Sequence, residues 1–297
     1  MQSQTTTPEV IEHEKHLVQQ QLGLDTTDAI IFIDAGWDSR VYMINDGYSF
    51  FKFPRSDKIR QRYQYEIAAL KLAATVNPAV QVPEVSWGHP SNEYFGYHGV
   101  PGTVLAEMIP TLTGNTKQTI GSIIGTFLKQ LHELSLPGAR MIPVDREIKQ
   151  FQEWYQPAVP VIQQMFSESE QRQLRTLVED TWPAQLLSLG SDTVLCHGDL
   201  GFRNCLYQDE TTIGIIDFGD VGYYDRSKDF INLTDPEIFE AALQAYGDSP
   251  ELRQKIAIRQ TVLQIIKLTA SIGKQDEQGV HQAITQLGEV LRQNKTT

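Results

Sequence analysis

One stretch of this chain, residues 196–229, limits the possible folds and chemistries more than any other: CHGDLGFRNCLYQDETTIGIIDFGDVGYYDRSKD. Asp199 is followed five residues later by Asn204, and Asp217 then opens the tripeptide Asp-Phe-Gly. The apolar run at residues 213–216 predicts a buried strand that ends at Asp217, and the glycines close to Asp199 predict a loop. Two carboxylates and one amide are therefore expected on loops at strand ends, where functional side chains are commonly displayed.

This set of side chains suits phosphoryl transfer. The reaction needs a carboxylate that accepts the proton of an attacking hydroxyl, and oxygen ligands that hold Mg²⁺ against nucleotide phosphates. Mg²⁺ takes few protein ligands, all of them oxygen. Asp199 is the candidate base, and Asn204 and Asp217 are the candidate metal ligands, because D-x4-N followed by D-F-G is the kinase order. Turn preferences alone can produce Asp-Phe-Gly, but they do not account for three parts in this order.

The motif nevertheless departs from that of protein kinases. Gly198 stands between His197 and the base, where protein kinases have arginine, and the ten residues between Gly219 and Phe230 exclude an activation segment with A-P-E. H-G-D-L-x3-N followed by I-I-D-F-G-D instead resembles the aminoglycoside phosphotransferase family, antibiotic kinases with a small-molecule version of the kinase fold. Within that family the chain is most similar to the 2''-phosphotransferases, over nearly its whole length. The resemblance implies that His197 braces the loop without exchanging protons with substrate.

The N-terminal part of the chain predicts a helix followed by a β-hairpin. Apolar residues recur along residues 8–22, and Gly23 is a helix stop signal. Three β-rich runs follow, at residues 29–34, 40–44 and 48–53. The turn Asn45-Asp46-Gly47 between two of these runs is a strong hairpin signal.

The connection at residues 35–39 lies where a kinase glycine loop is expected, but it lacks the pattern G-x-G-x-x-G. The family resemblance implies a short loop that closes over the nucleotide phosphates through backbone N–H groups and a hydroxyl. Gly36 and Ser39 would supply these groups. An ordinary hairpin turn explains the same residues equally well.

Lys52 lies inside the aromatic run Phe-Phe-Lys-Phe-Pro, although lysine is seldom buried without a partner. It is either an edge-strand or snorkelling residue, or the lysine that holds nucleotide phosphates and pairs with a helix glutamate. Glu66 lies on a predicted helix at residues 61–75, and the family resemblance K-F-P…E-x3-L favours it as the partner. Glu93 is the alternative.

The segment at residues 82–105 is rich in turn residues around short strands. The family resemblance implies that a strand here becomes a hinge between two lobes, and that the adenine or guanine base meets backbone groups near Phe95, His98 and Val100. The side chain of His98 can equally be structural or solvent-facing.

The second half of the chain predicts mainly helices. Residues 117–134 carry one apolar stripe, and further helices are expected within residues 145–190 and 234–290, where they would shape a substrate cleft. Asp225 and Asp229 resemble the structural aspartates that follow the metal loop in relatives.

Two acidic residues just beyond this region are candidate substrate ligands. Asp235 and Glu237 would bind ammonium groups of a cationic substrate. The alternative is a solvated helix start, because acidic residues favour the first turn of a helix.

The charge of the chain restricts its partners. A formal net charge of −12 argues against nucleic acid or an anionic membrane as a partner. Residues 191–250 contain twelve acidic and three basic residues, a net of −9, so the acidity is concentrated on the proposed catalytic half.

Cysteine usage and the N-terminus restrict the compartment. Cys196 and Cys205 flank the catalytic loop, but with His197 they do not match a zinc site in number or spacing, and buried free thiols are expected. The first ten residues have neither the apolar core nor the basic region of a signal peptide. No apolar run approaches the roughly 20 residues of a membrane helix. A cytoplasmic location is expected.

Together these features predict an α+β, bilobal, protein-kinase-like fold. A small antiparallel-sheet lobe at residues 1–100 would bind the nucleotide, and a larger, mainly helical lobe at residues 101–297 would carry catalysis and the substrate. The reaction would transfer the γ-phosphate of ATP or GTP, with Mg²⁺, to a hydroxyl of a small cationic molecule. The resemblance implies an aminoglycoside 2''-hydroxyl. A macrolide, choline, homoserine or fructosamine acceptor, or a nucleotide-binding pseudokinase, is the alternative.

Overall fold

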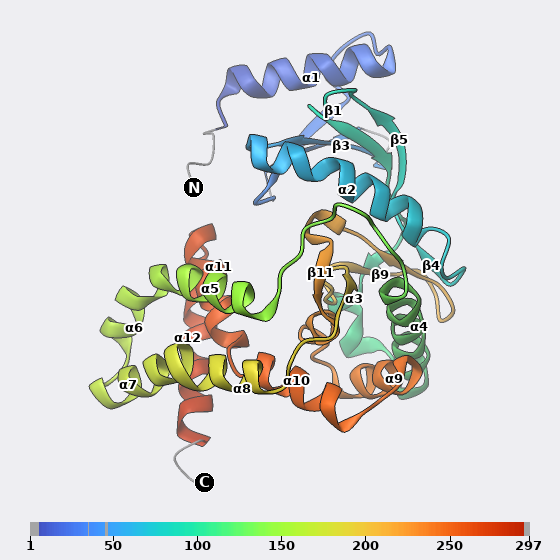
Figure 1. Cartoon of the computed structure of the whole chain (residues 1–297). Coiled ribbons are helices and arrows are strands. Elements are labelled where there is room, and N and C mark those ends of the chain that lie inside the picture. Colours follow the sequence, from blue (N-terminus) through green and yellow to red (C-terminus); the bar gives the residue numbers. More distant parts are fainter. Residues whose placement is uncertain (1–5, 35, 45–46, 294–297) are drawn as a thin grey trace. The chain divides into compact units, whose positions relative to one another are not determined.

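The computed structural model describes residues 6–34, 36–44 and 47–293, so Ala35, Asn45 and Asp46 of the predicted connections lie outside the described residues. The chain divides into two compact units (Figure 1). Unit 1 comprises Met1–Arg140, Leu195–Gly222 and Asn232–Gly247, and unit 2 comprises Met141–Val194, Tyr223–Ile231 and Asp248–Thr297. The chain passes between the units five times, so neither unit is one continuous stretch of chain. The assignment of functions to residues 1–100 and 101–297 stays a prediction.

Unit 1 contains a five-stranded antiparallel sheet with the order β1-β2-β3-β6-β5. The strands are β1 (Ile30–Ile33), β2 (Ser39–Ile44), β3 (Ser49–Pro54), β5 (Glu84–Gly88) and β6 (Phe95–His98). The three predicted β-rich runs are confirmed to within about one residue at each end. Lys52 of β3 lies opposite Val41 of β2 and Phe95 of β6, so it occupies the middle of the sheet and not an edge.

Two helices accompany this sheet. Helix α1 (Pro8–Leu22) begins after the capping side chain of Thr7 and ends at Gly23, whose φ of 66° is readily adopted by glycine, as the sequence predicts. Helix α2 (Asp57–Ala73) is capped by Ser56. Its buried residues recur three or four positions apart, which gives it one inward face: Ile59, Tyr63, Glu66, Ala69, Leu70 and Ala73.

The rest of unit 1 contains a second sheet with the order β4-β10-β9-β7. Its strands are β4 (Val80–Gln81), β7 (Thr103–Val104), β9 (Cys205–Tyr207) and β10 (Ile213–Ile215). Three helices complete this part, α3 (Leu105–Met108), α4 (Gly114–His132) and α9 (Pro236–Tyr246). Helices α4 and α9 lie side by side (Figure 1) because Gly121 and Gly125 let their backbones approach: a Cβ at either glycine would overlap a carbonyl oxygen of α9.

Unit 2 is mainly helical, as predicted for residues 145–190 and for much of 234–290. Its helices are α5 (Val144–Tyr155), α6 (Val159–Met165), α7 (Glu168–Thr176), α8 (Trp182–Ser188), α10 (Pro250–Gln260), α11 (Leu263–Lys274) and α12 (Glu277–Gln293). They enclose one apolar core that includes Phe151, Trp182, Ile265 and Leu287. The short strands β8 (Thr193–Cys196) and β11 (Gly222–Asp225) pair with each other. In the described part of the chain no helix is both long enough and apolar enough to span a bilayer.

Candidate active site

The catalytic motif lies in unit 1, on loops at the ends of short strands. Asp199 and Asn204 fall between β8 and β9, and Asp217 follows β10, as the sequence predicts. Strands β9 and β10 are antiparallel neighbours, and the backbone N–H of Ile216 donates to the carbonyl oxygen of Asn204 at 3.0 Å. This pairing brings Asn204 and Asp217 to the same edge of the sheet.

Asn204 holds Asp199 in place. Its Nδ2 donates to the carbonyl oxygen of Asp199 at 2.8 Å and to the carboxylate Oδ2 at 3.2 Å. The amide nitrogen is thereby committed to Asp199, and the amide oxygen Oδ1 is left as an acceptor. An amide oxygen together with the carboxylate of Asp217 is a set of hard oxygen donors, which fits Mg²⁺.

Asp217 has an unusual backbone conformation. Its φ of 63° places it in the left-handed region, which costs a residue other than glycine about 1–2 kcal/mol. Its side chain is 56% exposed. The fold therefore holds a strained turn that presents this carboxylate to solvent at the end of β10.

His197 joins the catalytic loop, which carries Asp199, to the loop that carries Asp217, here called the metal loop. Its ring is fully buried, 4.6 Å from the ring of Phe218. Nδ1 accepts from the backbone N–H of Asp199 at 3.3 Å, and Nε2 lies 3.0 Å from the carbonyl oxygen of Ile216, to which only a protonated Nε2 can donate. The two contacts fit the tautomer with its proton on Nε2, and the ring braces Asp199 against the residue that precedes Asp217.

Gly198 accounts for the departure from the protein-kinase motif. Its φ is 90°, and a Cβ at this position would overlap the carbonyl oxygen of Asp220. An arginine cannot occupy this position because both the conformation and the space require glycine. The close approach packs the catalytic loop directly against the residue after Asp-Phe-Gly.

Lys52 and Glu66 form a buried ion pair, with Nζ 2.6 Å from Oε1. Asp217 Oδ1 lies 3.3 Å from the same Nζ. Burial by itself would lower the pKa of Lys52, but Glu66 and Asp217 outweigh it and hold the pKa well above its usual value. Burial raises the pKa of Glu66, which Lys52 opposes. The alternative partner, Glu93, instead contacts His89 and Ser91.

The predicted phosphate loop is held by contacts with Arg55 and Tyr63. Arg55 Nε donates to the carbonyl oxygen of Gly36 at 3.2 Å, and a Cβ at Gly36 would overlap the carbonyl oxygen of Ser39. Ser39 is buried, and its Oγ accepts from the hydroxyl of Tyr63 at 2.8 Å. The hydroxyl of Ser39 therefore has a partner on the inward face of α2, and a phosphate contact of Ser39 stays a prediction. The backbone N–H groups and the Ser39 hydroxyl remain the candidate phosphate ligands of this loop.

Two ion pairs that the motif analysis missed flank this site. Arg62 Nη1 lies 3.2 Å from Asp38 Oδ2, and Arg140 Nη2 donates to Asp220 at its Oδ1 (2.5 Å) and its carbonyl oxygen (2.7 Å). Burial and then the charge of Asp220 raise the pKa of Asp38, which Arg62 and Arg140 oppose. The loop is therefore within electrostatic reach of the metal loop. Arg62 could have been found from its position one turn before Glu66, whereas no local pattern marks Arg140.

The side chains of the residues predicted to bind the purine contact other residues of the protein. The ring of Phe95 is fully buried, with Lys52 Nζ 5.9 Å from its centre. The ring of His98 stacks on the ring of Tyr48, with 5.0 Å between their centres, which fits the structural role given above as the alternative for His98. Val100 packs against β10, where a Cβ at Gly214 would overlap its side chain. Contact with a purine therefore stays a prediction for the backbone groups of Phe95, His98 and Val100.

The two candidate substrate carboxylates begin helix α9. Asp235 is its N-cap: Oδ1 accepts from the backbone N–H groups of Glu237 and Ile238 at 3.1 Å, and Lys117 donates to Oδ2 at 2.8 Å. Burial would raise the pKa of Asp235, but Lys117 and these N–H groups lower it. These contacts are those of a residue at a helix start, which is the alternative given above for Asp235. Glu237 is 52% exposed with Lys117 3.8 Å away, so it is the better placed of the two to meet a ligand.

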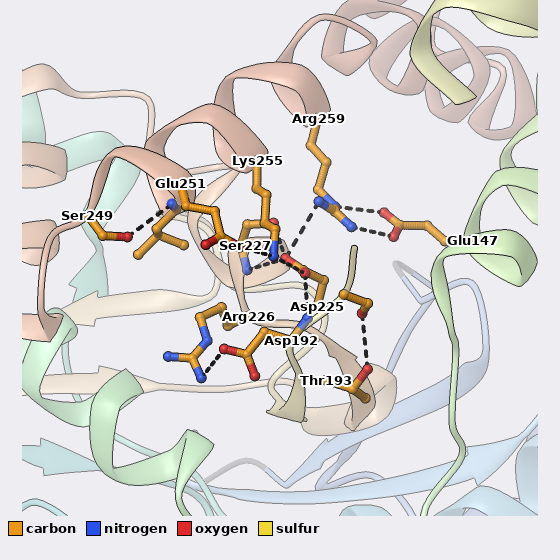
Figure 2. Close-up of polar contacts among 12 residues, drawn as sticks. Glu147, Asp192, Thr193, Asp225, Arg226, Ser227, Ser249, Glu251, Lys255 and Arg259 are labelled. Atoms are coloured by element: carbon orange, nitrogen blue, oxygen red, sulfur yellow. Dashed lines mark hydrogen bonds and ion pairs between the residues drawn. The ribbon is translucent and has the colours of Figure 1, made fainter. Parts of the chain in front are cut away.

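Asp225, one of the two predicted structural aspartates, organises a charged network inside unit 2 (Figure 2). Its side chain is fully buried, Ser227 Oγ donates to it at 2.6 Å, and Lys255 and Arg259 lie 3.5 and 3.6 Å from it. Arg259 also pairs with Glu147 at 2.8 Å (Figure 2). Burial would raise the pKa of Asp225, but Arg259, Ser227 and a backbone N–H outweigh it and lower it. The network pairs buried charges of opposite sign.

The two cysteines are buried free thiols, as predicted. Burial raises the pKa of Cys205 to about 12. A neutral thiol is a poor metal ligand, so this cysteine behaves as a small apolar residue.

A family model for the APH phosphotransferase enzyme family matches residues 29–258, which is well over half of the sequence. The chain belongs to this family. The curated aminoglycoside 3'-phosphotransferases of Escherichia coli and Salmonella typhimurium are each 33% identical to this family member over 86 residues. That match covers 26% of this chain and 32% of each relative, so it spans about a third of the relatives' length.

Solved structures resemble this phosphotransferase family member over almost its whole length. The GDP and kanamycin complex of APH(2'')-IIIa superposes with a TM-score of 0.77 at 20% identity, covering 95% of this chain and 99% of the other. The streptomycin and ATP complex of APH(2'')-IIa gives 0.67 at 17% identity, covering 96% and 97%. The macrolide 2'-phosphotransferase MphH from Brachybacterium faecium gives 0.58 at 20% identity, covering 94% and 98%. The predicted kinase-like α+β fold, with an antiparallel sheet and a mainly helical part, is confirmed.

Proposed function

We propose that this protein transfers the γ-phosphate of a purine nucleoside triphosphate, ATP or GTP, to a hydroxyl of an aminoglycoside, with the 2''-hydroxyl as first choice. The observation that carries the proposal is the double restraint on Asp199. Asn204 binds its carbonyl oxygen and carboxylate, and His197 accepts from its backbone N–H. These restraints support a role for the Asp199 carboxylate as the group that receives the proton of an acceptor hydroxyl.

Each restrained group has one task in this mechanism. Asp199 orients the acceptor hydroxyl and takes its proton as the new oxygen–phosphorus bond forms. Lys52, oriented by Glu66, binds the nucleotide phosphates. Asn204 Oδ1 and the Asp217 carboxylate would hold Mg²⁺, which would neutralise phosphate charge. Most of the acceleration comes from positioning and charge stabilisation, as phosphoryl transfer requires.

The acceptor assignment rests on charge and on relatives. The chain carries −12 overall, and the exposed carboxylate of Glu237 offers a contact for an ammonium group. The structures of APH(2'')-IIIa and APH(2'')-IIa were obtained with kanamycin and streptomycin. Phosphorylation of such an antibiotic would confer resistance. The cytoplasmic location predicted from the sequence agrees with this role and stays a prediction.

A coupled turnover assay tests the proposal. Purified protein with Mg²⁺ and either ATP or GTP is given 4,6- and 4,5-disubstituted aminoglycosides, a macrolide, choline, homoserine and a fructosamine. Phosphorylation of 4,6-disubstituted aminoglycosides alone, at the 2''-oxygen by NMR of the product, is the expected result. Turnover with another acceptor would replace the substrate and keep the mechanism.

Asp199→Ala separates catalysis from binding. The variant is expected to lose turnover and to lose resistance in cells, while nucleotide affinity stays within about threefold, because Asp199 acts on the acceptor proton. Equal resistance from cells carrying the variant and the wild type would contradict an enzymatic role and favour a nucleotide-binding pseudokinase.

A further inference from the structure

Three cations around the active site of unit 1 are paired with carboxylates. The ion pairs are Lys52 with Glu66, Arg62 with Asp38, and Arg140 with Asp220. A nucleoside triphosphate brings several negative charges, and phosphoryl transfer moves charge between the attacking and leaving oxygens. Each paired cation has part of its charge already neutralised by its partner, so an unpaired cation would add to the charge that Mg²⁺ would supply.

Arg203 is a cation of the catalytic loop with no such partner. Its side chain is exposed, and within residues 6–34, 36–44 and 47–293 it makes no hydrogen bond or ion pair. It stands four residues after Asp199 and immediately before Asn204. Its side chain therefore leaves the backbone between the candidate base, Asp199, and the candidate metal ligand, Asn204.

The backbone that carries Arg203 is fixed on both sides. The backbone N–H of Asn204 donates to the carbonyl oxygen of Gly201 at 2.9 Å, which closes a turn around residues 201–204. The carbonyl oxygen of Phe202 accepts from the N–H of Ala106 at 3.1 Å, and the Phe202 side chain is buried. An exposed arginine on an anchored turn loses little backbone entropy when it binds a ligand.

We propose that Arg203 is a further catalytic residue whose guanidinium binds the transferred phosphoryl group. In the step, the acceptor oxygen forms a bond to the γ-phosphorus, and the bond from that phosphorus to the β-phosphate oxygen breaks. The bonding electron pair leaves with the nucleoside diphosphate, and the hydroxyl proton goes to Asp199. The proposal rests on the proposed phosphoryl transfer, but not on the identity of the acceptor.

The chemistry of arginine favours phosphate over the acceptor as its ligand. Guanidinium is always charged and presents planar N–H donors that match phosphoryl oxygens in pairs. An unpaired guanidinium turned toward a polyammonium acceptor would repel it. The same charge turned toward the equatorial oxygens stabilises the transition state, where a single donor is worth about 10²- to 10³-fold in kcat.

Three variants test this assignment: Arg203→Ala, Arg203→Lys and the control Lys129→Ala, which removes one exposed positive charge from α4 of the same unit. The measurements are kcat and KM for transfer to the acceptor that the wild type uses, and phosphate release to water without acceptor. Affinity for nucleoside diphosphate and Mg²⁺ is measured with and without aluminium fluoride, which mimics the transferred group. Circular dichroism and melting temperature check the fold.

Arg203→Ala is expected to lower kcat by about 10²- to 10³-fold and to weaken the aluminium fluoride complex similarly, while diphosphate affinity changes by less than about threefold. Arg203→Lys should recover part of kcat, and Lys129→Ala should match the wild type. Unchanged kcat in Arg203→Ala would overturn the assignment, as would equal loss of affinity with and without aluminium fluoride. If the wild type phosphorylates no aminoglycoside, the proposed acceptor fails, whereas phosphate release and the aluminium fluoride complex still decide the role of Arg203.

Discussion

The buried pair of Lys52 and Glu66 gives a quantitative prediction through a double-mutant cycle. The single variants are Glu66→Leu and Lys52→Met, and the third is the double variant. Each single change leaves one charge buried without its main partner, whereas the double change replaces the pair by apolar side chains of similar length. We expect the double variant to be more stable than the sum of the single effects predicts.

The structure sets the size of this coupling. The two side chains are 11% and 6% exposed, with 2.6 Å between Lys52 Nζ and Glu66 Oε1. With charge centres about 3 Å apart and an effective dielectric constant of about 20, the gross attraction is about 5 kcal/mol. Loss of one partner of a buried pair costs about 3–5 kcal/mol. Asp217, 3.3 Å from Lys52, still pairs with the lysine when Glu66 is removed, so we expect about 2–4 kcal/mol for Glu66→Leu and a coupling energy of about 2 kcal/mol.

Urea unfolding followed by circular dichroism and by tryptophan fluorescence gives the free energy of unfolding of each variant. The kinetic cycle in kcat/KM for nucleotide is the second readout, because Lys52 without Glu66 is expected to turn toward Asp217 and hinder metal binding. Single effects that add to within about 0.5 kcal/mol would refute the reasoning. Such additivity would mean that the two charges do not stabilise each other in solution.

Three further predictions concern the loops and the charged network. Gly198→Ala is expected to lower kcat about 10²-fold in a protein with wild-type circular dichroism, because the added Cβ overlaps the carbonyl oxygen of Asp220 and displaces the base; wild-type kcat would contradict this geometry. His197→Ala is expected to lower both kcat and melting temperature while KM for nucleotide changes by less than about threefold, and a change in nucleotide KM alone would argue against bracing of the base. Asp225→Asn removes a carboxyl group whose pKa is lower in the folded than in the unfolded protein. The stability that this group contributes is therefore fully present above the unfolded pKa of about 3.9. It is lost as the pH falls through the folded pKa. The gap in melting temperature between wild type and this variant should be full near neutral pH and narrow below about pH 4, and a gap independent of pH would exclude Arg259 as the cause.

Short-range patterns predicted much of the candidate site. Asp199, Asn204 and Asp217 were found because they lie on two loops joined by a strand pair, and loop spacing of a few residues fixes which side chains can meet. Helix α1 was predicted to the residue, since a Pro start and a Gly stop act locally. Glu66 was predicted from its helix and the family resemblance, and the structure brings it to Lys52.

Long-range packing decided the remaining contacts. The sequence predicts Ser39 as a phosphate ligand. The contact of its hydroxyl with Tyr63 on the inward face of α2 is visible only in the fold. The pairing of Arg140 with Asp220 joins residues 80 positions apart and has no local signal. Such contacts depend on which faces of distant elements meet, which no window of sequence contains.

The sequence by itself determined which residues are candidates for the chemistry, and the tertiary structure decided how each of these groups is held. Spacing within residues 196–229 predicts a carboxylate base and two oxygen ligands, because local backbone geometry controls side chains a few residues apart. Three features emerged only from the fold: the contacts of the His197 ring, the requirement for glycine at position 198 and the ion pair of Asp235 with Lys117. Each depends on a partner brought near by the burial of apolar surface elsewhere in the chain, which is a property of the whole unit.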